Sequence, residues 1–237
     1  NGDPRRISFS ARGSGVSWTS TDFFDVEDQR GEGIDGLKVL SDKLGIFKTN
    51  SIFTYDEIEL KQRITGVGAY NHKVIQEIDG TVYTFCPNGI FATNLFQAKQ
   101  IGEPVRQYWE NFRPIYDTTV GRVCTNTFSG KFKNHYRLYI QDITDPDSTN
   151  DVVLDYDTKQ KAWTVHYGFT DFWHFLSVDR FRFGDRSPNA IPAMFGGDSS
   201  GKYYRFFENK YIDSQSTPVK QGSDIFQDLV SDTGSII

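Results

Sequence analysis

The sequence has few cysteines, which excludes a disulfide framework as the basis of its fold. Only Cys86 and Cys124 occur in 237 residues, far fewer than in small secreted domains held together by disulfides. Both lie in segments that read as strands. We predict buried free thiols, and a disulfide between neighbouring strands remains the alternative. No zinc or haem spacing of cysteines and histidines is present.

Short motifs typical of catalysis are also missing. The sequence contains no P-loop, no G-x-S-x-G and no G-x-G-x-x-G, which are the common signatures of phosphate, acyl-transfer and dinucleotide sites. The four histidines form no HxH or HxxxH pair, and none follows a nucleophile motif, so core or interface packing is expected. They are His72, His135, His166 and His174. We therefore predict that the chain is not an enzyme and has no catalytic, cofactor-binding or metal-ligating residue.

Long apolar runs and excess positive charge are absent as well. No apolar run reaches about 18 residues, so no membrane span is predicted. The net charge of −5 does not indicate a nucleic-acid-binding protein, because phosphate affinity requires clustered lysine and arginine. The sequence opens with neither Met nor a signal-peptide pattern. A mature product and a fragment are both compatible with this start.

Aromatic residues are abundant, and they occur in short runs of strand length. Aromatics make up 15% of the chain, with 20 Phe and 12 Tyr, and such residues pack well across strands. Residues 34–55 read IDGLKVLSDKLGIFKTNSIFTY. The runs LKVL, GIFK and SIFTY are separated only by turn formers, which leaves no room for a crossover helix. The segment is therefore predicted to be an antiparallel meander.

Three further segments repeat this plan, in residues 73–94, 136–167 and 191–213. The uneven spacing of about 50 residues falls in the range of four-stranded propeller blades. We predict an all-β, β-propeller-like array of antiparallel meanders, with about four blade equivalents and one short helix. Residues 1–213 form this domain, with units near 5–63, 64–113, 114–169 and 170–213. Residues 214–237 are polar, either a C-terminal tail or the start of a further segment.

Several connecting elements can also be assigned. Residues 5–11 alternate as a strand, and residues 57–62 extend the third strand of the first meander. Residues 103–112 carry the best helix signal, because Pro104 suits a first turn and Val105, Tyr108, Trp109 and Phe112 share one face. Residues 120–128 are a strand, and residues 129–134 a basic turn.

Three clusters of charged residues have both a functional and a structural interpretation. Acidic residues crowd one loop, but that loop lacks the glycine and the terminal glutamate of a calcium loop, so a solvated turn is favoured over a metal site. The acidic residues are Asp142, Asp145, Asp147 and Asp151. The second cluster is the segment from Asp155 to Trp163, which has the outline D-x-D-x-x-x-x-x-W. In this pattern an aspartate caps a turn and the tryptophan packs between blades, and both roles are structural. The third cluster lies in the loop that begins at Asp179, where acidic and basic side chains neutralise one another. A solvated surface is favoured there over a site that contacts phosphate. Its charged residues are Asp179, Arg180, Arg182, Asp185 and Arg186.

The order of these segments resembles a known family. RRISFSA, TDFF, the 34–55 meander, EIDGTVYTFCPNGIFATN, IGEPVRQYW and VLDYDTKQKAWTV follow one another along the chain. This order is similar to the β-propeller of neck and tail proteins of short-tailed phages, namely the tail nozzle (tail tubular protein B) and packaged-DNA stabilisation proteins. The resemblance covers roughly residues 5–210. Family members are usually longer, with extra blades and a platform or tip domain, so a partial ring, a fragment and a ring of few blades all stay open.

The resemblance implies a mechanical function. Such proteins form rings, typically sixfold, below the portal and adaptor, where they retain packaged DNA and let it pass at ejection. The expected partners are identical subunits, the portal, adaptor or other tail proteins, and genomic DNA passing through the lumen without sequence-specific binding. The expected location is the virion, after synthesis in the host cytoplasm.

Two other classes of function compete with this one. The first is a glycan-binding or glycan-cleaving propeller, for which Trp18, Trp109 or Trp173 would supply a platform. The second is a generic protein-interaction propeller. The residues 214–237 and the aromatic-rich outer surfaces are expected to contact neighbouring subunits in the phage reading.

Overall fold

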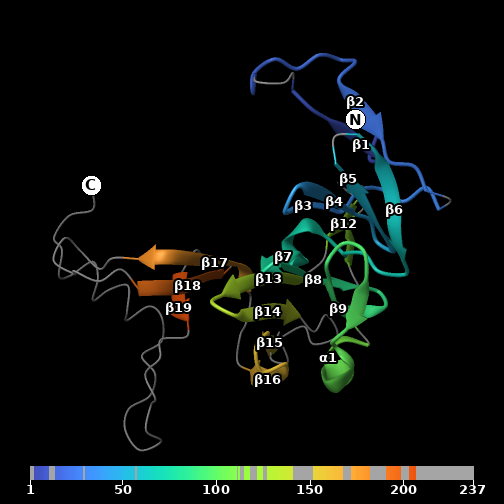
Figure 1. Cartoon of the computed structure of the whole chain (residues 1–237). Coiled ribbons are helices and arrows are strands. Elements are labelled where there is room, and N and C mark those ends of the chain that lie inside the picture. The colour runs from blue at the N-terminus through green and yellow to red at the C-terminus, as the bar shows by residue number, and fades with distance from the viewer. Residues whose placement is uncertain are drawn as a thin grey trace, which may run out of the picture. The chain divides into compact units, whose positions relative to one another are not determined.

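The computed structural model describes residues 3–10, 14–28, 30–56, 58–110, 112, 115–117, 122–124, 127–140, 152–167, 172–181, 191–198 and 203–206. It divides into two compact units, Asn1–Arg106 and Gln107–Ile237, and each is described by itself. Every strand pairing among the described residues is antiparallel, and most strands follow one another as meanders (Figure 1). The predicted all-β, propeller-like array with one short helix is therefore confirmed.

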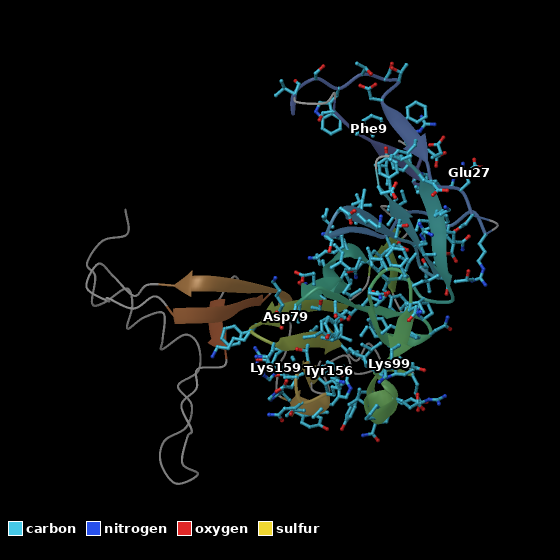
Figure 2. The ribbon with its side chains drawn as sticks, in the orientation of Figure 1. Phe9, Glu27, Asp79, Lys99, Tyr156 and Lys159 are labelled. Atoms are coloured by element: carbon cyan, nitrogen blue, oxygen red, sulfur yellow. The ribbon has the colours of Figure 1, made fainter. Side chains whose placement is uncertain are left out.

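The first unit contains a two-stranded ribbon and two four-stranded sheets. The ribbon joins β1 (Arg6–Ser8) to β2 (Phe23–Asp25), and Phe9 lies at its far end (Figure 2). The first sheet has the order β3 (Gly36–Leu40), β4 (Lys43–Phe47), β5 (Ser51–Tyr55) and β6 (Leu60–Thr65). The second sheet has the order β10 (Ala98–Gln100), β9 (Gly89–Thr93), β8 (Thr81–Cys86) and β7 (Gln76–Ile78). A short 3₁₀ turn, η1 (His72–Val74), leads into β7.

One face of the first sheet forms a core with the ribbon. Ile46 of β4 and Phe53 of β5 are opposite each other in register, so both side chains point to the same face. They form a buried cluster with Val26, and Ile7 and Phe24 from the ribbon pack against it. Alternate residues of a strand point to the same face, so the apolar residues of β4 and β5 on this face form the surface that the ribbon covers.

The opposite face of the first sheet approaches the second sheet at two glycines. A Cβ atom on Gly45 would lie 2.7 Å from a methyl of Leu95, and one on Gly36 would lie 2.3 Å from a methyl of Ile75. Leu95 and Ile75 are both buried. The glycines therefore leave the space that these side chains fill, one from the connection between β9 and β10 and one from the residue before β7.

The connector between these sheets is hydrogen-bonded to both of them. Ala69 N donates to Lys48 O (2.9 Å), and Tyr70 N donates to Phe85 O (2.9 Å). Thr84 Oγ1 donates to Gly68 O (2.8 Å). The connector backbone thus ties the residue after β4 to β8, and these bonds satisfy polar groups of the buried residues Gly68 and Ala69.

The described residues of the second unit form three sheets. A small pair joins β11 (Ile115–Asp117) to β12 (Arg122–Cys124). A four-stranded sheet has the order β13 (Thr127–Phe132), β14 (His135–Ile140), β15 (Val152–Asp157) and β16 (Ala162–Tyr167), and a three-stranded sheet has the order β17 (Phe172–Phe181), β18 (Ile191–Asp198) and β19 (Tyr203–Phe206).

Both faces of the β13–β16 sheet are buried. Leu138 and Leu154 are paired on one face, while Tyr139 and Val153 are paired on the other and cluster with Phe128. All five side chains are at most 4% exposed. A sheet covered on both faces has the pattern expected of a blade within a stack rather than of a sheet with one solvated face.

Some predicted elements differ in extent. The expected helix over 103–112 is a 3₁₀ turn, η2 (Glu103–Val105), followed by one α-helical turn, α1 (Arg106–Trp109). The sequence gives a reason. Pro114 disfavours helical geometry in the residue before it, and a helix this short is only marginally stable. Val105, Trp109 and Phe112 are nevertheless buried, as the apolar face predicts.

The structure also differs from the sequence prediction in three strands and one turn. The polar segment expected to extend the third strand is a separate fourth strand, β6, and β10 had no apolar pattern to mark it. The expected basic turn over 129–134 is strand through Phe132, and only Lys133 and Asn134 form the turn. The expected strand over 120–128 is divided between β12 and β13. These polar segments are strands because their backbones pair with a neighbouring apolar strand. The hydrogen-bond ladder between two strands requires no apolar side chain.

Candidate functional site

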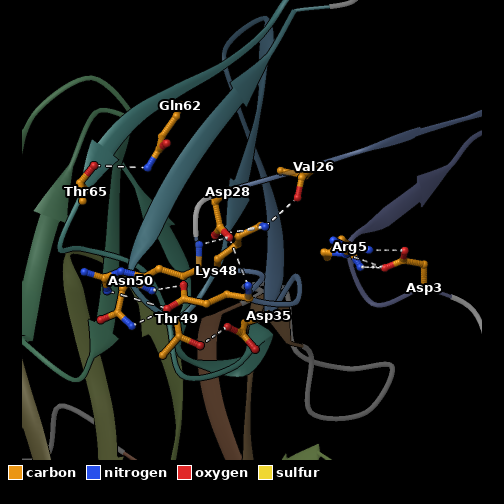
Figure 3. Close-up of polar contacts among 12 residues, drawn as sticks. Asp3, Arg5, Val26, Asp28, Asp35, Lys48, Thr49, Asn50, Gln62 and Thr65 are labelled. Carbon is orange, nitrogen blue, oxygen red and sulfur yellow. Dashed lines mark hydrogen bonds and ion pairs between the residues drawn. The ribbon is translucent and has the colours of Figure 1, made fainter.

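A buried lysine organises the polar centre of the first unit. Lys48 follows β4, and its side chain is 0% exposed. Its Nζ donates to Val26 O at 2.7 Å and lies 3.2 Å from Asp28 Oδ2 (Figure 3). Nζ also lies 5.5 Å from the ring centroid of Phe53. Because removing an ammonium from water costs several kcal/mol, a buried lysine needs partners of this kind.

Asp28 is the carboxylate that neutralises this lysine. Its side chain is 4% exposed, and Oδ1 accepts hydrogen bonds from Arg30 N (3.1 Å) and Glu32 N (3.2 Å). Burial acts to raise the pKa of Asp28, but the bond to Lys48, its positive charge and the backbone N–H groups outweigh burial, and the net pKa lies below the usual range. Asp28 is therefore a carboxylate at neutral pH.

Two more acidic side chains attach the same loop to the turn after β4. Thr49 Oγ1 donates to Asp35 Oδ2 at 2.8 Å (Figure 3). Asn50 donates to both oxygens of Glu32, from N at 3.1 Å and from Nδ2 at 2.8 Å. Burial raises the pKa of Asp35 to about 6, the charge of Glu32 acts in the same direction, and the bond from Thr49 opposes them. Three consecutive turn residues thus each hold one acidic side chain of the preceding loop.

A polar pocket of about 270 Å³ opens beside this network. Its lining residues are all polar: Asp28, Arg30, Asn50, Ser51, Gln62 and Thr65. The carboxylate of Asp28 is already committed to Lys48 and two backbone amides. Ser51 Oγ is buried and has no hydrogen-bond partner among the residues that the structure describes. The arrangement offers hydroxyl and amide groups in a small volume, without an activated nucleophile beside a general base.

A second buried charge cluster lies on the β13–β16 sheet. Asp155 on β15 pairs with Arg137 on β14, with Nε 2.8 Å from Oδ2, and both side chains are at most 6% exposed. His135 Nδ1 lies 2.8 Å from Asp155 Oδ1, and His166 Nε2 lies 3.6 Å from Oδ2. The antiparallel register accounts for this meeting, because Arg137 is directly opposite Asp155.

The electrostatics of the second cluster favour fixed charges. Burial acts to raise the pKa of Asp155, but the nearby His166 imidazole and the charge and hydrogen bond of Arg137 outweigh it, so the net pKa is lowered. Burial also lowers the pKa of the Arg137 guanidinium, against the opposing effect of Asp155. The guanidinium lies 5.2 Å from the ring centroid of Phe132 as well. The cluster joins three strands through one carboxylate.

Asp157 has the turn-capping role expected of the D-x-D-x-x-x-x-x-W segment. Its Oδ1 accepts from Lys159 N (2.8 Å) and Gln160 N (3.0 Å), and from Asn134 Nδ2 (2.8 Å). Trp163 packs its ring on Tyr156 across the strand pair, with centroids 4.8 Å apart. The capping prediction is confirmed by these bonds, and the first aspartate of the segment, Asp155, forms the ion pair with Arg137.

The other residues considered from the sequence are placed as follows. Cys86 is a buried free thiol whose pKa is raised by burial. Trp18 is 60% exposed, and Trp109 is buried. His72 accepts a hydrogen bond from Leu37 N (3.4 Å).

The acidic loop from Asp142 to Asp151, Arg182, Asp185, Arg186 and residues 207–237 lie outside the described residues. The segments of Cys124, Trp173, His174, Asp179 and Arg180 are strands β12 and β17, so the predicted loop after 178 begins later than expected. Within the described part of the chain, no group of three potential ligands is arranged to hold a metal ion.

The comparisons with known proteins do not assign a family. No protein-family model matches the chain, and no curated protein matches it. Among solved structures, the extracellular domain of a putative one-component system from B. thetaiotaomicron aligns with a TM-score of 0.43 and 13% identity, over 74% of this chain and 20% of that chain. The chain thus spans about a fifth of the length of that structure. No helix within the described ranges is long and apolar enough to cross a membrane.

Proposed function

We propose that the chain is a structural protein of a bacteriophage neck or tail, in which it forms part of the DNA conduit or plug below the portal. The order of the segments that resemble that family supports the proposal. These segments fall, in turn, on β1, on β2, on the first and second sheets, on η2 with α1, and on β15 with β16. One shared segment is a weak signal, whereas a shared order of short segments on consecutive elements is a stronger one.

The chemistry of the buried clusters agrees with a mechanical role. Lys48 and Arg137 are each held by a buried aspartate, and these pairs join a loop to a sheet or one strand to the next. We propose identical subunits, six to a ring, as the main partners, with portal, adaptor or other tail proteins at its ends. Genomic DNA passes through the lumen without sequence-specific contacts. The site of action is the virion, after synthesis in the host cytoplasm, and no enzymatic activity is expected.

The mass of the native particle tests this proposal. The measurement is multi-angle light scattering of the purified chain over a range of concentrations, with negative-stain images of the same fractions. Rings of six subunits with a lumen wide enough for duplex DNA are the expected result. A monomer at every concentration, also in the presence of the neighbouring tail proteins, would contradict the proposal.

A glycan-binding propeller is the second candidate, and the exposure of Trp18 favours it. The Trp18 indole Nε1 donates to Gly15 O at 3.0 Å, which fixes the ring while 60% of the residue stays exposed. A fixed, exposed aromatic face is suited to stacking on a sugar ring. A glycan screen decides between the candidates. If the chain binds glycans through Trp18, Trp18→Ala abolishes binding. The control Ile58→Ala, at a residue that is 94% exposed, leaves binding unchanged. No binding by the wild type removes this candidate and leaves the general interaction propeller as the remaining alternative.

A further inference from the structure

We propose that four lysines on two adjacent turns of the second unit form a binding surface for the phosphate backbone of duplex DNA. These residues, here called the lysine surface, are Lys131, Lys133, Lys159 and Lys161. Lys131 lies near the end of β13 and Lys133 in the turn that follows it, while Lys159 and Lys161 lie in the β15–β16 turn. Figure 2 shows Lys159 at the β15–β16 turn.

Hydrogen bonds hold the two turns together. Thr158 N donates to Asn134 O at 2.8 Å, and Asn134 Nδ2 donates to Asp157 Oδ1 at 2.8 Å. The register agrees, because Phe132 pairs with His135 and His135 pairs with Asp157. Both turns therefore lie at the same end of the sheet, which brings the four lysines to that end although Asn134 and Asp157 are 23 positions apart in sequence.

The local charge of this surface is opposite to that of the whole chain. The two turns together with the strand residues next to them, residues 131–134 and 157–161, carry four lysines and one acidic residue, Asp157, for a net charge of +3, against −5 for the chain. Hydrogen bonds from Gln160 N, Lys159 N and Asn134 lower the pKa of Asp157, so this carboxylate is directed to the backbone of its own turn. Lys133, Lys159 and Lys161 are exposed, and Lys131 is half-buried.

The kind of residue favours phosphate over a protein partner. The surface contains lysine and no arginine in either turn. Lysine is a flexible point charge that binds phosphate without demanding a fixed geometry, whereas protein interfaces are enriched in arginine and depleted in lysine. A surface of lysines thus suits weak contacts to any sequence, which a passing polymer requires. The choice of duplex DNA as that polymer rests on the proposed function.

Salt-dependent DNA binding by the intact chain is the test. Fluorescence anisotropy is measured with labelled duplexes of two unrelated sequences from 50 to 200 mM NaCl. If four phosphates are neutralised, log K falls with log salt at a slope of about −0.9 per contact, so affinity drops by about 100-fold over this range. Both duplexes are expected to give the same affinity and the same slope.

A charge-matched pair of variants locates the binding. The test variant carries lysine-to-glutamine changes throughout the lysine surface and is expected to lose both the affinity and the salt dependence. The control variant makes the same charge change in the first unit. Its substitutions are Lys38→Gln, Lys61→Gln, Lys73→Gln and Lys99→Gln. Circular dichroism of both variants verifies that they fold.

The outcomes separate this inference from the proposed function. Equal binding by the test variant and the wild type, or no salt-dependent binding at 50 mM NaCl, overturns the inference. Competition by polyglutamate as effective as that by DNA also overturns it, in favour of an acidic polypeptide. Light scattering of the same samples reports ring assembly independently. Lysine-dependent DNA binding without rings would support the lysine surface and contradict the proposed conduit. Rings without DNA binding would support the conduit and contradict the lysine surface.

Discussion

Replacing Lys48 with methionine is expected to destabilise the first unit by about 3–5 kcal/mol, because the change leaves a buried carboxylate without its counter-ion. Methionine retains most of the apolar stem, so the loss falls mainly on the ammonium group. Two contacts disappear with it: the 3.2 Å ion pair to Asp28 Oδ2 and the 2.7 Å hydrogen bond to Val26 O. Asp28 Oδ1 keeps its two backbone donors, which places the expected cost at the lower part of this range.

A double-mutant cycle distinguishes an unpaired charge from a loss of packing. Asp28→Asn removes the negative charge but keeps an oxygen that accepts from the backbone. The double variant, Lys48→Met with Asp28→Asn, is therefore expected to be more stable than Lys48→Met alone by about 1–3 kcal/mol. The control is Lys43→Met, which breaks a 3.3 Å pair with Asp56 whose two side chains are 23% and 30% exposed. A much smaller change is expected there, because partly exposed pairs contribute little.

The assay must report on the first unit alone, because two compact units need not unfold together. Hydrogen exchange measured by mass spectrometry on peptides from β4 and β5 gives a local free energy of opening. A loss of 3 kcal/mol corresponds to exchange faster by roughly 100-fold, since 1.4 kcal/mol is a factor of ten. A loss under about 1 kcal/mol for Lys48→Met, or strict additivity in the cycle, would refute the reasoning about an uncompensated charge.

Three further predictions follow from particular contacts. Gly68→Ala is expected to cost about 3 kcal/mol or more, because its Cβ would lie 1.9 Å from a backbone carbonyl; Gly15→Ala, with open space around its Cβ, is the control, and urea denaturation compares them. Asp35 has a folded pKa of about 6 against 3.8, so its neutral form stabilises the fold below pH 4 and this stability is lost as pH rises through 6. Asp35→Asn should remove that decline, a difference of about 1–2 kcal/mol after allowing for screening, and thermal melts from pH 4 to 8 that show the same slope in both proteins would contradict this. Asp155→Asn leaves the Arg137 guanidinium buried without its counter-ion, and a loss of about 3–5 kcal/mol is expected; hydrogen exchange in β14 and β15 that matches the wild type would exclude this role.

The fold could be predicted wherever a strand buries alternate apolar side chains. GIFK, SIFTY and TVYTFC were assigned from this pattern, and all three are strands in antiparallel sheets. The fourth strands of the first two sheets were missed for a physical reason. β6 reads LKQRIT and β10 reads AKQ, and their side chains are mostly exposed. Such edge strands are held by the backbone ladder, which leaves no signal in the side-chain pattern.

The candidate site was harder to predict, because its partners meet through tertiary structure. Lys48 and Asp28 are 20 positions apart, and Arg137 and Asp155 are 18 apart on neighbouring strands. One signal was available in each case: a basic residue stands within an apolar run, GIFK for Lys48 and YRLYI for Arg137. A charge in a run that must be buried requires a buried partner. Which aspartate serves as that partner depends on strand register and loop path, and a single sequence does not contain them.

Residues 34–55, one of the segments that carry the family resemblance, have a structural explanation at several polar or small positions. Gly36 and Gly45 admit the apolar side chains of Ile75 and Leu95, from connecting segments beside the second sheet. Lys48, Thr49 and Asn50 each hold one acidic residue of the preceding loop. These positions of residues 34–55 therefore serve to pack the first sheet against its neighbouring segments and to fasten the loop that enters it. A resemblance carried by such positions reports shared packing and not shared chemistry, so measurements of assembly test it more directly than any assay of activity.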